Sequence, residues 1–286
     1  MDDYRVFRVP RAESGMTSTT TYVLLHGLGL SHRSFTALAA ALSMSGETIA
    51  IDLPGFGGTA PPKHSMSVED YAAGVGNVLT RINAGRRIKV GPRSPAGPTV
   101  VLGHSMGAQV ALELALTRPE LVDLLVMAGP VVDLRRRNVA VQGALLLGDI
   151  VQEPIRTKLM AGGEYVKCGP VWFLDAVRSM LDYPTHERIK QLKQPLLVMR
   201  GEHDVIANES WCAWLCRHVN DGELTTIPKQ WHNAVHTSPD EVAHLLARFA
   251  ERSLRNTRPP AESRTMAPLT GDGTVKSHGL DPVDPL

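Results

Sequence analysis

A single serine between two glycines is the first feature of the sequence that could do chemistry. The stretch Gly103-His104-Ser105-Met106-Gly107 fits the pattern G-x-S-x-G. The apolar run VVL leads into it, and the helix-forming run AQVALELAL follows it. This order predicts a sharp strand-to-helix turn, a nucleophile elbow, that exposes the serine oxygen above a sheet. The backbone N–H of Met106 would then point towards an oxygen near Ser105 and would stabilise an oxyanion.

Two further residues could activate this serine, because a hydroxyl attacks only when a base removes its proton and an acid orients that base. Asp204 ends the apolar run PLLVMRGEHD, and His232 comes just after the last strand-like run, ELTTIP. Both the acid and the histidine are expected directly after the carboxyl end of a strand. Ser105, Asp204 and His232 are therefore the predicted catalytic triad.

Other histidines and acids compete for these roles. His236 is a rival base four residues further on, and Asp133, after the preceding strand, is a rival acid. His104 is interpreted as a packed structural histidine whose side chain points away from the serine. His26 is interpreted as a hydrogen-bonded brace of the loop that follows its strand, rather than as a proton-transfer group.

Residues 20–252 resemble the α/β-hydrolase-fold serine hydrolases, a lid-containing family of esterases and lipase-like enzymes. The resemblance implies the α/β-hydrolase fold, a mostly parallel sheet with helices on both faces and an inserted helical lid. It rests on five blocks: HGLG (26–29), DLPGFGGT (52–59), GHSMG (103–107), LLVMRGEHD (196–204) and WHNAVHTSPDEV (231–242).

The resemblance also implies roles for individual residues. In this family the residue after the early His-Gly pair supplies a second N–H of the oxyanion hole, and that position is Leu28 here. Proline stands seven residues after the family's catalytic histidine, and Pro239 stands seven after His232, which favours His232 over His236. The GEHD block favours Asp204 as the acid over its rival.

The family pattern is not followed everywhere. Trp231 stands before the predicted catalytic histidine, where the family usually has glycine, and Val205 follows the acid, where several relatives have proline. Asp52 in the DLPG block matches no triad position and is interpreted as structural.

The elements that must position these residues are visible as alternating patterns. Strand-like apolar runs alternate with helical patterns, which is typical of a mostly parallel sheet covered on both faces. Ser67 to Asp70 resembles a capping box that opens a helix, and Pro239 stands at the first position of the last helix. The strand-like runs are 4–9, 21–27, 47–55, 99–105, 123–130, 195–204 and 223–228.

Three segments depart from this alternation. Residues 84–98 are interpreted as an extended basic surface loop, and the Pro- and Gly-rich end of the chain as a disordered tail. In a third segment the strand rhythm stops, and helical patterns at 138–160 and 169–183 indicate an inserted cap. The expected organisation is a hydrolase core at 1–130 and 195–253, a helical lid at 131–194 and a tail at 254–286.

Composition narrows the class of protein. The chain has 286 residues, of which 43% are hydrophobic, and its 30 Lys and Arg nearly balance its 29 Asp and Glu. This balance favours neither nucleic acid nor an anionic membrane as a partner. No signal-peptide pattern or apolar run of 18 residues is visible, and the three cysteines suit a reducing compartment. We expect a cytoplasmic protein without a membrane span, as a monomer or homodimer.

No cofactor or metal is expected. Cys212, Cys216 and His218 could suggest a metal site, but the segment WCAWLCRH is typical of an amphipathic helix with small buried residues. The sequence also contains no phosphate-cradling loop.

The predicted chemistry is acyl transfer to water, with a carboxylic ester of a small to medium, largely apolar molecule as substrate. Carbon–carbon bond hydrolysis and acyl transfer to an alcohol use the same residues and stay open. A ligand receptor with vestigial hydrolysis is the alternative that is not an enzyme. The acyl pocket could be lined by lid residues that could equally be core residues: Trp172, Phe173, Met180 and Tyr183.

Overall fold

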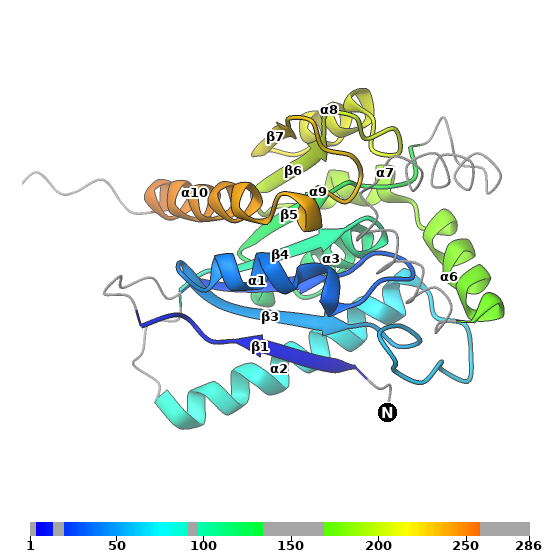
Figure 1. Ribbon diagram of the computed structural model, residues 1–286, viewed down its shortest axis with the longest axis horizontal. Coiled ribbons are helices and arrows are strands. Elements are labelled where there is room, and N and C mark those ends of the chain that lie inside the picture. The colour runs from blue at the N-terminus through cyan, green and yellow to red at the C-terminus, as the bar shows by residue number, and fades with distance from the viewer. Residues whose placement is uncertain (1–3, 14–19, 91–96, 134–168, 258–286) are drawn as a thin grey trace, which may run out of the picture.

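A seven-stranded, mostly parallel sheet forms the centre of the part of the chain that the structure describes (Figure 1). The structure is a computed structural model that describes residues 4–13, 20–90, 97–133 and 169–257. The spatial order of the strands is β1-β3-β2-β4-β5-β6-β7, and only β1 runs antiparallel to its neighbour. The strands are β1 (Arg5–Val9), β2 (Thr20–Leu25), β3 (Gly46–Asp52), β4 (Thr99–His104), β5 (Leu124–Ala128), β6 (Leu196–Gly201) and β7 (Gly222–Ile227).

Helices cover both faces of this sheet, as predicted (Figure 1). Successive side chains of a strand point to opposite faces, so Val23 and Leu25 of β2 join one apolar cluster, and Tyr22 and Leu24 join the other. Helices of the first cluster are α2 (Val68–Val90), α3 (Met106–Thr117), α6 (Pro170–Asp182) and α8 (Glu209–Arg217), and those of the second are α1 (Thr36–Leu42), α9 (Ala234–Thr237) and α10 (Pro239–Thr257).

The side of the sheet on which successive strands are added changes at β2. From β2 the chain moves to β3 on one side and then crosses to β4 on the other. Loops that leave the carboxyl ends of parallel strands diverge at such a point, and the crevice between them is where open α/β sheets bind ligands. The loop after β2 and the turn after β4 therefore lie side by side at this edge.

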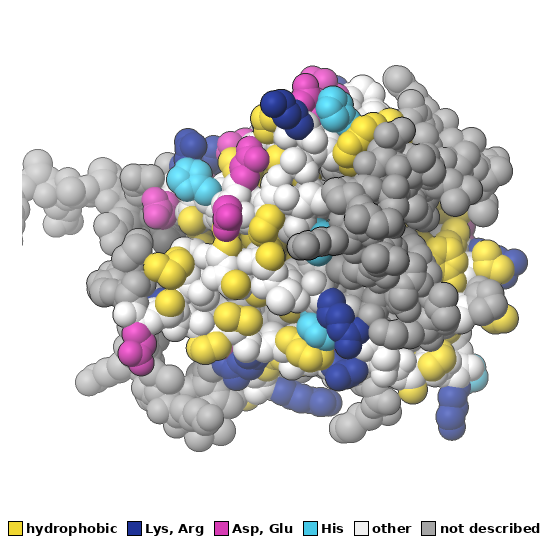
Figure 2. All heavy atoms as spheres, in the orientation of Figure 1, with side chains coloured by type: hydrophobic (Ala, Val, Ile, Leu, Met, Phe, Trp, Pro, Cys, Tyr) yellow, Lys and Arg dark blue, Asp and Glu magenta, His cyan; other side chains and the backbone are white. Residues whose placement is uncertain are grey.

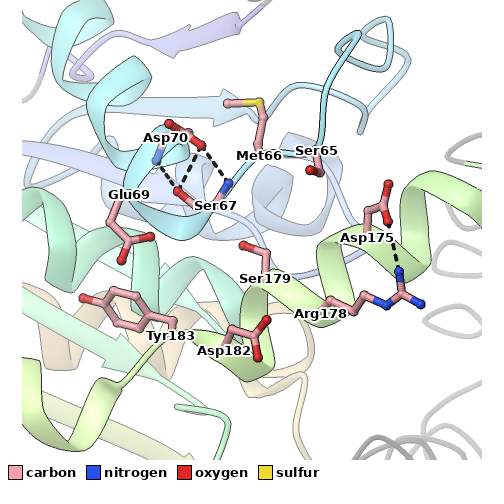
Figure 3. A pocket seen from close by; sticks show the side chains of 10 residues that line it. All are labelled: Ser65, Met66, Ser67, Glu69, Asp70, Asp175, Arg178, Ser179, Asp182 and Tyr183. Carbon is pink, nitrogen blue, oxygen red and sulfur yellow. Dashed lines mark hydrogen bonds and ion pairs between the residues drawn. The ribbon is translucent and has the colours of Figure 1, made fainter.

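The predicted capping box opens α2. Asp70 Oδ2 accepts from the Ser67 N–H at 2.9 Å, and Ser67 Oγ accepts from the Asp70 N–H at 3.1 Å (Figure 3). Each side chain satisfies an amide that the helix leaves without a partner, which explains why the helix begins here.

Two helices continue further than the sequence analysis predicted. α2 extends to Val90, so the interpretation of residues 84–98 as a loop is wrong for its first half. Arginine and lysine are good helix formers, and the first proline of this segment is Pro92. Likewise α10 ends at Thr257, past the boundary expected at 254, and before Pro259.

The segment predicted as a lid contains α6, the short helix α7 (Thr185–Arg188) and a 3₁₀ turn at Ile189–Gln191. α6 confirms the helical pattern at 169–183, and Pro170 stands at its first position. The other helical pattern, at 138–160, lies outside the described residues, as does the part of the expected tail from 258 on. The lid as a unit stays a prediction.

A buried polar network joins α3 to α6 and α7. The Glu113 carboxylate accepts from the Tyr183 hydroxyl at 2.8 Å, and from Nε and Nη2 of Arg188 at 2.9 and 2.7 Å. One turn earlier, the Gln109 amide donates to the Met180 carbonyl oxygen at 3.0 Å and to Thr185 Oγ1 at 3.1 Å. Burial, with the charge of the neighbouring carboxylate, raises the pKa of Tyr183 far above its usual value. Tyr183 is therefore a neutral donor.

The described surface carries both signs of charge. Figure 2 shows both acidic and basic side chains on the visible face, in keeping with a formal net charge of +1. None of the described helices combines the length and apolar character needed to cross a membrane.

The substitution Glu113→Gln should lower the free energy of unfolding by ~1–3 kcal/mol, because one amide oxygen cannot satisfy three donors. The matched control is Glu120→Gln, since Glu120 pairs with Arg118 on the surface. That variant should change stability by less than about 1 kcal/mol. Urea unfolding measures both, and equal losses in the two variants would contradict the importance of the buried network.

Candidate active site

Ser105 sits in a strained turn between β4 and α3. Its φ of 56° lies in the left-handed region, which residues other than glycine rarely adopt. Its N–H donates to the Ala128 carbonyl oxygen of β5 at 2.9 Å, and its own carbonyl oxygen accepts from the Ala108 N–H at 2.9 Å. Strand and helix thus hold the turn from both sides.

The two glycines of the motif allow this turn to form. A Cβ atom on Gly103 would lie 2.0 Å from the Gly107 carbonyl oxygen, and one on Gly107 would lie 2.3 Å from the Leu25 carbonyl oxygen. Gly27 is also close, because a Cβ there would lie 3.0 Å from Ser105 Cβ. Crowding between the strand, the turn and the returning helix is therefore the reason for these glycines.

The three residues predicted as a triad meet at the carboxyl edge of the sheet. Ser105 Oγ lies 3.1 Å from His232 Nε2, and His232 Nδ1 lies 2.9 Å from Asp204 Oδ2. Asp204 follows β6, and His232 lies in the loop between β7 and α9. With a proton on Nδ1, the imidazole donates to the carboxylate and presents a lone pair to the serine hydroxyl.

Asp204 is held as a carboxylate. Its Oδ1 accepts from the N–H groups of Ile206 and Ala207 at 2.9 and 2.8 Å. Burial alone would raise the pKa of Asp204, but the charge and hydrogen bond of His232 and the two N–H groups together lower it below its usual value. The group is therefore ionised at neutral pH and able to orient the imidazole.

Arg200 braces the turn that carries Asp204, and the sequence analysis missed it. Its Nε donates to the Ala207 carbonyl oxygen at 2.9 Å, while Nη2 donates to those of Glu202 and Asp204, both at 3.1 Å. The side chain is buried. The signal that could have revealed it is a lone basic residue in the apolar run LLVMRG, because buried arginines must be hydrogen-bonded.

Gly129 is a second residue that the sequence analysis missed. It follows β5 with a φ of 57°, and a Cβ atom there would lie 2.9 Å from His232 Cε1 and 3.0 Å from Nδ1. The imidazole therefore packs directly on this glycine, which leaves no room for a side chain.

The two residues predicted for the oxyanion hole each follow a residue of the elbow region: Met106 follows Ser105, and Leu28 follows Gly27, where a Cβ would lie 3.0 Å from Ser105 Cβ. Met106 is the first residue of α3, so its N–H has no acceptor within the helix. Leu28 lies in the turn after β2, which the Leu30 N–H closes by donating to the Gly27 carbonyl oxygen at 3.1 Å. Their role in binding an oxyanion stays a prediction.

Two buried side chains hold the loop after β2. His26 Nδ1 lies 2.9 Å from the Gly27 carbonyl oxygen, and its Nε2 accepts from the Leu53 N–H at 2.9 Å, so the residue braces the loop as expected. Asp52 accepts from the backbone N–H of His32 and contacts its ring nitrogen at 2.8 Å. These contacts are structural, in agreement with the interpretation of Asp52.

The rival residues have other neighbours. Asp133 accepts from Asn208 Nδ2 at 3.0 Å, and His236 lies on α9, whereas His232 is the histidine that reaches Ser105. His104 is buried, with Nε2 3.1 Å from the carbonyl oxygen of His232.

Two of the candidate pocket residues belong to the packing of α6. The Tyr183 hydroxyl is bonded to Glu113, and the Trp172 indole lies against Gly55, where a Cβ would meet its Nε1 at 1.8 Å.

A cavity of about 420 Å³ separates α6 from the start of α2 (Figure 3). None of the predicted triad residues lines it; its lining consists of Ser65, Met66, Ser67, Glu69, Asp70, Asp175, Arg178, Ser179, Asp182 and Tyr183. Within the described ranges, no three His, Cys, Asp or Glu residues are grouped so as to hold a metal ion.

A mostly parallel sheet with a Ser–His–Asp arrangement at its carboxyl edge defines the α/β-hydrolase class of protein. The chain belongs to the alpha/beta hydrolase family, whose sequence model matches residues 22–245.

Named relatives and solved structures are similar over most of the chain. It is 24% identical over 255 residues to the pimeloyl-[acyl-carrier protein] methyl ester esterase of Nitrosospira multiformis, covering 80% of this chain and 93% of that protein. A thermophilic esterase from Thermogutta terrifontis has a TM-score of 0.70 at 17% identity, covering 87% of this chain and 93% of the other. A meta-cleavage product hydrolase from Pseudomonas fluorescens has a TM-score of 0.67 at 20% identity, with coverage of 87% and 94%. At these identities, the solved structures share the fold.

The substitution Gly129→Ala should displace the His232 ring and slow the reaction of Ser105 with a fluorophosphonate probe by at least about tenfold, part of the 10²–10⁴ that a positioned base contributes. Gly169→Ala is the matched control, because Gly169 also has a positive φ, of 78°, but a methyl group added there would meet no atom of the described residues within 4 Å. The measurement compares the rates at which the probe labels the two purified variants. Equal rates would mean that backbone strain, and not contact with the ring, explains the loss.

The substitution Arg200→Lys should loosen the turn after β6, because an ammonium group cannot span three carbonyl oxygens as a guanidinium does. Amide hydrogen exchange at Ile206 and Ala207 should accelerate about tenfold, equivalent to ~1.4 kcal/mol of local opening free energy. In the control Arg252→Lys, at a half-exposed ion pair with Glu223, exchange at these amides should stay unchanged. Unchanged exchange in Arg200→Lys would show that the turn does not need its brace.

Proposed function

We propose that this protein is a serine hydrolase that cleaves a carboxylic ester of a small to medium, largely apolar substrate through an acyl-enzyme intermediate. The observation that carries the proposal is the continuous chain of hydrogen bonds from Ser105 Oγ through the His232 ring to Asp204. A buried, ionised acid, a correctly oriented imidazole and a half-buried elbow serine are the parts that acyl transfer requires.

The reaction follows from this arrangement. His232 Nε2 takes the proton of Ser105 as Oγ attacks the ester carbonyl carbon, and Asp204 stabilises the imidazolium that forms. The N–H groups of Leu28 and Met106 bind the tetrahedral oxyanion. The imidazolium then gives its proton to the departing alcohol, and a water molecule, activated by the same imidazole, releases the acid.

Surroundings and relatives support an apolar ester as substrate. Leu28 and Met106, whose N–H groups would bind the oxyanion, have buried apolar side chains. The relative from Nitrosospira multiformis is named for a methyl ester, and the structural neighbour from Thermogutta terrifontis is an esterase. An apolar acyl group gains free energy by leaving water for such surroundings.

The first test compares wild type with Ser105→Ala on p-nitrophenyl esters from acetate to decanoate. The variant should lose on the order of 10⁶ in kcat, because the serine, histidine and acid act as a unit. Ser43→Ala, on the surface at the end of α1, should retain wild-type turnover. The wild-type rate should fall at acidic pH, since a protonated His232 cannot accept the serine proton.

Other outcomes of this test separate the alternatives. Full activity in Ser105→Ala would refute the assignment of the nucleophile. Wild-type inactivity on every ester would refute simple ester hydrolysis and leave carbon–carbon bond hydrolysis or ligand binding to explain the arrangement. Formation of a new ester when an alcohol is added would identify an acyltransferase.

A further inference from the structure

Two adjacent residues, His104 and Ser105, contact His232, one at its backbone and the other at its ring. Ser105 Oγ lies 3.1 Å from the ring atom Nε2, and the side chain of the preceding residue, His104, reaches the backbone carbonyl oxygen of the same His232 through its own Nε2, also at 3.1 Å. The two imidazole rings lie 5.1 Å apart between their centroids. The elbow therefore controls both the ring and the main chain of His232.

The chemistry of the acceptor determines the state of His104. A carbonyl oxygen only accepts, so His104 Nε2 must carry the proton and donate it. Its Nδ1 is buried, has no hydrogen-bond partner among the described residues, and lies over Gly27, where a Cβ atom would be 3.3 Å away. Burial, followed by the charge of His232, lowers the pKa of His104 to about 3. The hydrogen bond to the His232 backbone and the charge of Asp204 act in the opposite direction, and His26 acts in the same direction. His104 is a neutral donor in neutral solution.

We propose that His104 is a positioning residue of the proposed reaction, whose Nε2–H holds the main chain of His232 so that the ring stays within reach of the Ser105 hydroxyl. The inference rests on the proposed function. It gives His104 a role beyond that of a packed structural histidine.

The loop that carries His232 is restrained on both sides of that residue; after it, the Asn233 carbonyl oxygen accepts from the N–H groups of His236 and Thr237 at 2.8 and 3.0 Å. It lies between β7 and α9 and is irregular, and two contacts that tie its start to neighbouring segments act on Gln230. This residue accepts at its carbonyl oxygen from the His203 N–H at 2.9 Å, and at Oε1 from the Thr237 hydroxyl at 2.6 Å. Both contacts lie two residues before His232, whereas His104 acts on His232 itself.

A neutral donor also suits the chemistry. His232 becomes an imidazolium during the proposed reaction, and a second cation about 5 Å away would oppose that charge. Because His104 keeps its proton on Nε2 and takes up no second one at neutral pH, it fixes the position of His232 without raising the free energy of the imidazolium.

The test uses a matched pair of variants. His104→Gln keeps an N–H donor close to the place of Nε2, whereas His104→Met has a similar length and no donor. We expect kcat on the best p-nitrophenyl ester to fall about 100-fold in His104→Met, the scale of a misplaced catalytic group, with KM within about twofold of wild type. His104→Gln should recover most of this loss. The acidic limb of the kcat/KM profile should coincide in wild type and His104→Gln, because His104 does not titrate there.

Several results would overturn the proposal. These are a wild-type kcat in folded His104→Met, an equal loss in both variants, or a shifted acidic limb in His104→Gln. If His104→Met does not fold, His104→Asn replaces it, because its shorter amide cannot reach the His232 carbonyl oxygen, and it should lose as much kcat as a variant without a donor.

A measurement that does not need turnover separates this inference from the proposed function. In wild-type protein labelled with ¹⁵N-histidine, NMR should show His104 with its proton on Nε2 and without titration between pH 5 and 8. A proton on Nδ1, or titration in that range, would refute the contact. The expected signal in a protein without esterase activity would instead mean that the contact stands and that the proposed function fails.

Discussion

The meeting of three distant loops at one edge of the sheet is the constraint on which the rest of the structure depends. Ser105, Asp204 and His232 follow β4, β6 and β7, and hydrogen bonds of about 3 Å between them tolerate little displacement. Parallel strands bring their carboxyl ends to a common edge, so the register of β4 to β7 sets the spacing of these loops. Two apolar clusters, one on each face, hold that register.

The loops can approach one another at this edge only if small residues leave space and if their buried polar groups find hydrogen-bond partners within the protein. Gly103 and Gly129 supply the space, one under the elbow and the other under the His232 ring. Arg200 donates to a backbone carbonyl oxygen of the turn that carries Asp204, and His104 donates to one of the loop that carries His232. The turn that carries Asp204 takes hydrogen bonds from a buried side chain of β6, the strand that it follows, and the loop that carries His232 takes one from the buried last residue of β4. Such buried partners fix a loop more firmly than solvent would.

Local patterns were sufficient to predict the strands, the elbow and the start of α2. An apolar run, a glycine pair and a capping box act over a few residues, so the sequence shows them directly. The same reasoning was wrong at the end of α2, where residues 84–90 were interpreted as the first part of an extended basic surface loop. Charge reports exposure to solvent and does not end a helix. Proline does, and the first proline after the last residue of each helix stands two positions further on, at Pro92 and Pro259.

The sequence by itself determined the fold class, the chain order of Ser105, Asp204 and His232, and the glycines that the elbow needs. It could not determine which side chains brace these residues, because that depends on contacts between segments far apart in the chain. Arg200 looks like an ordinary strand residue until the turn after β6 folds back over it, and Gly129 looks like a simple turn residue until His232 arrives from beyond β7. Only the tertiary structure decided these partners, since burial and hydrogen-bond distance are properties of the packed chain.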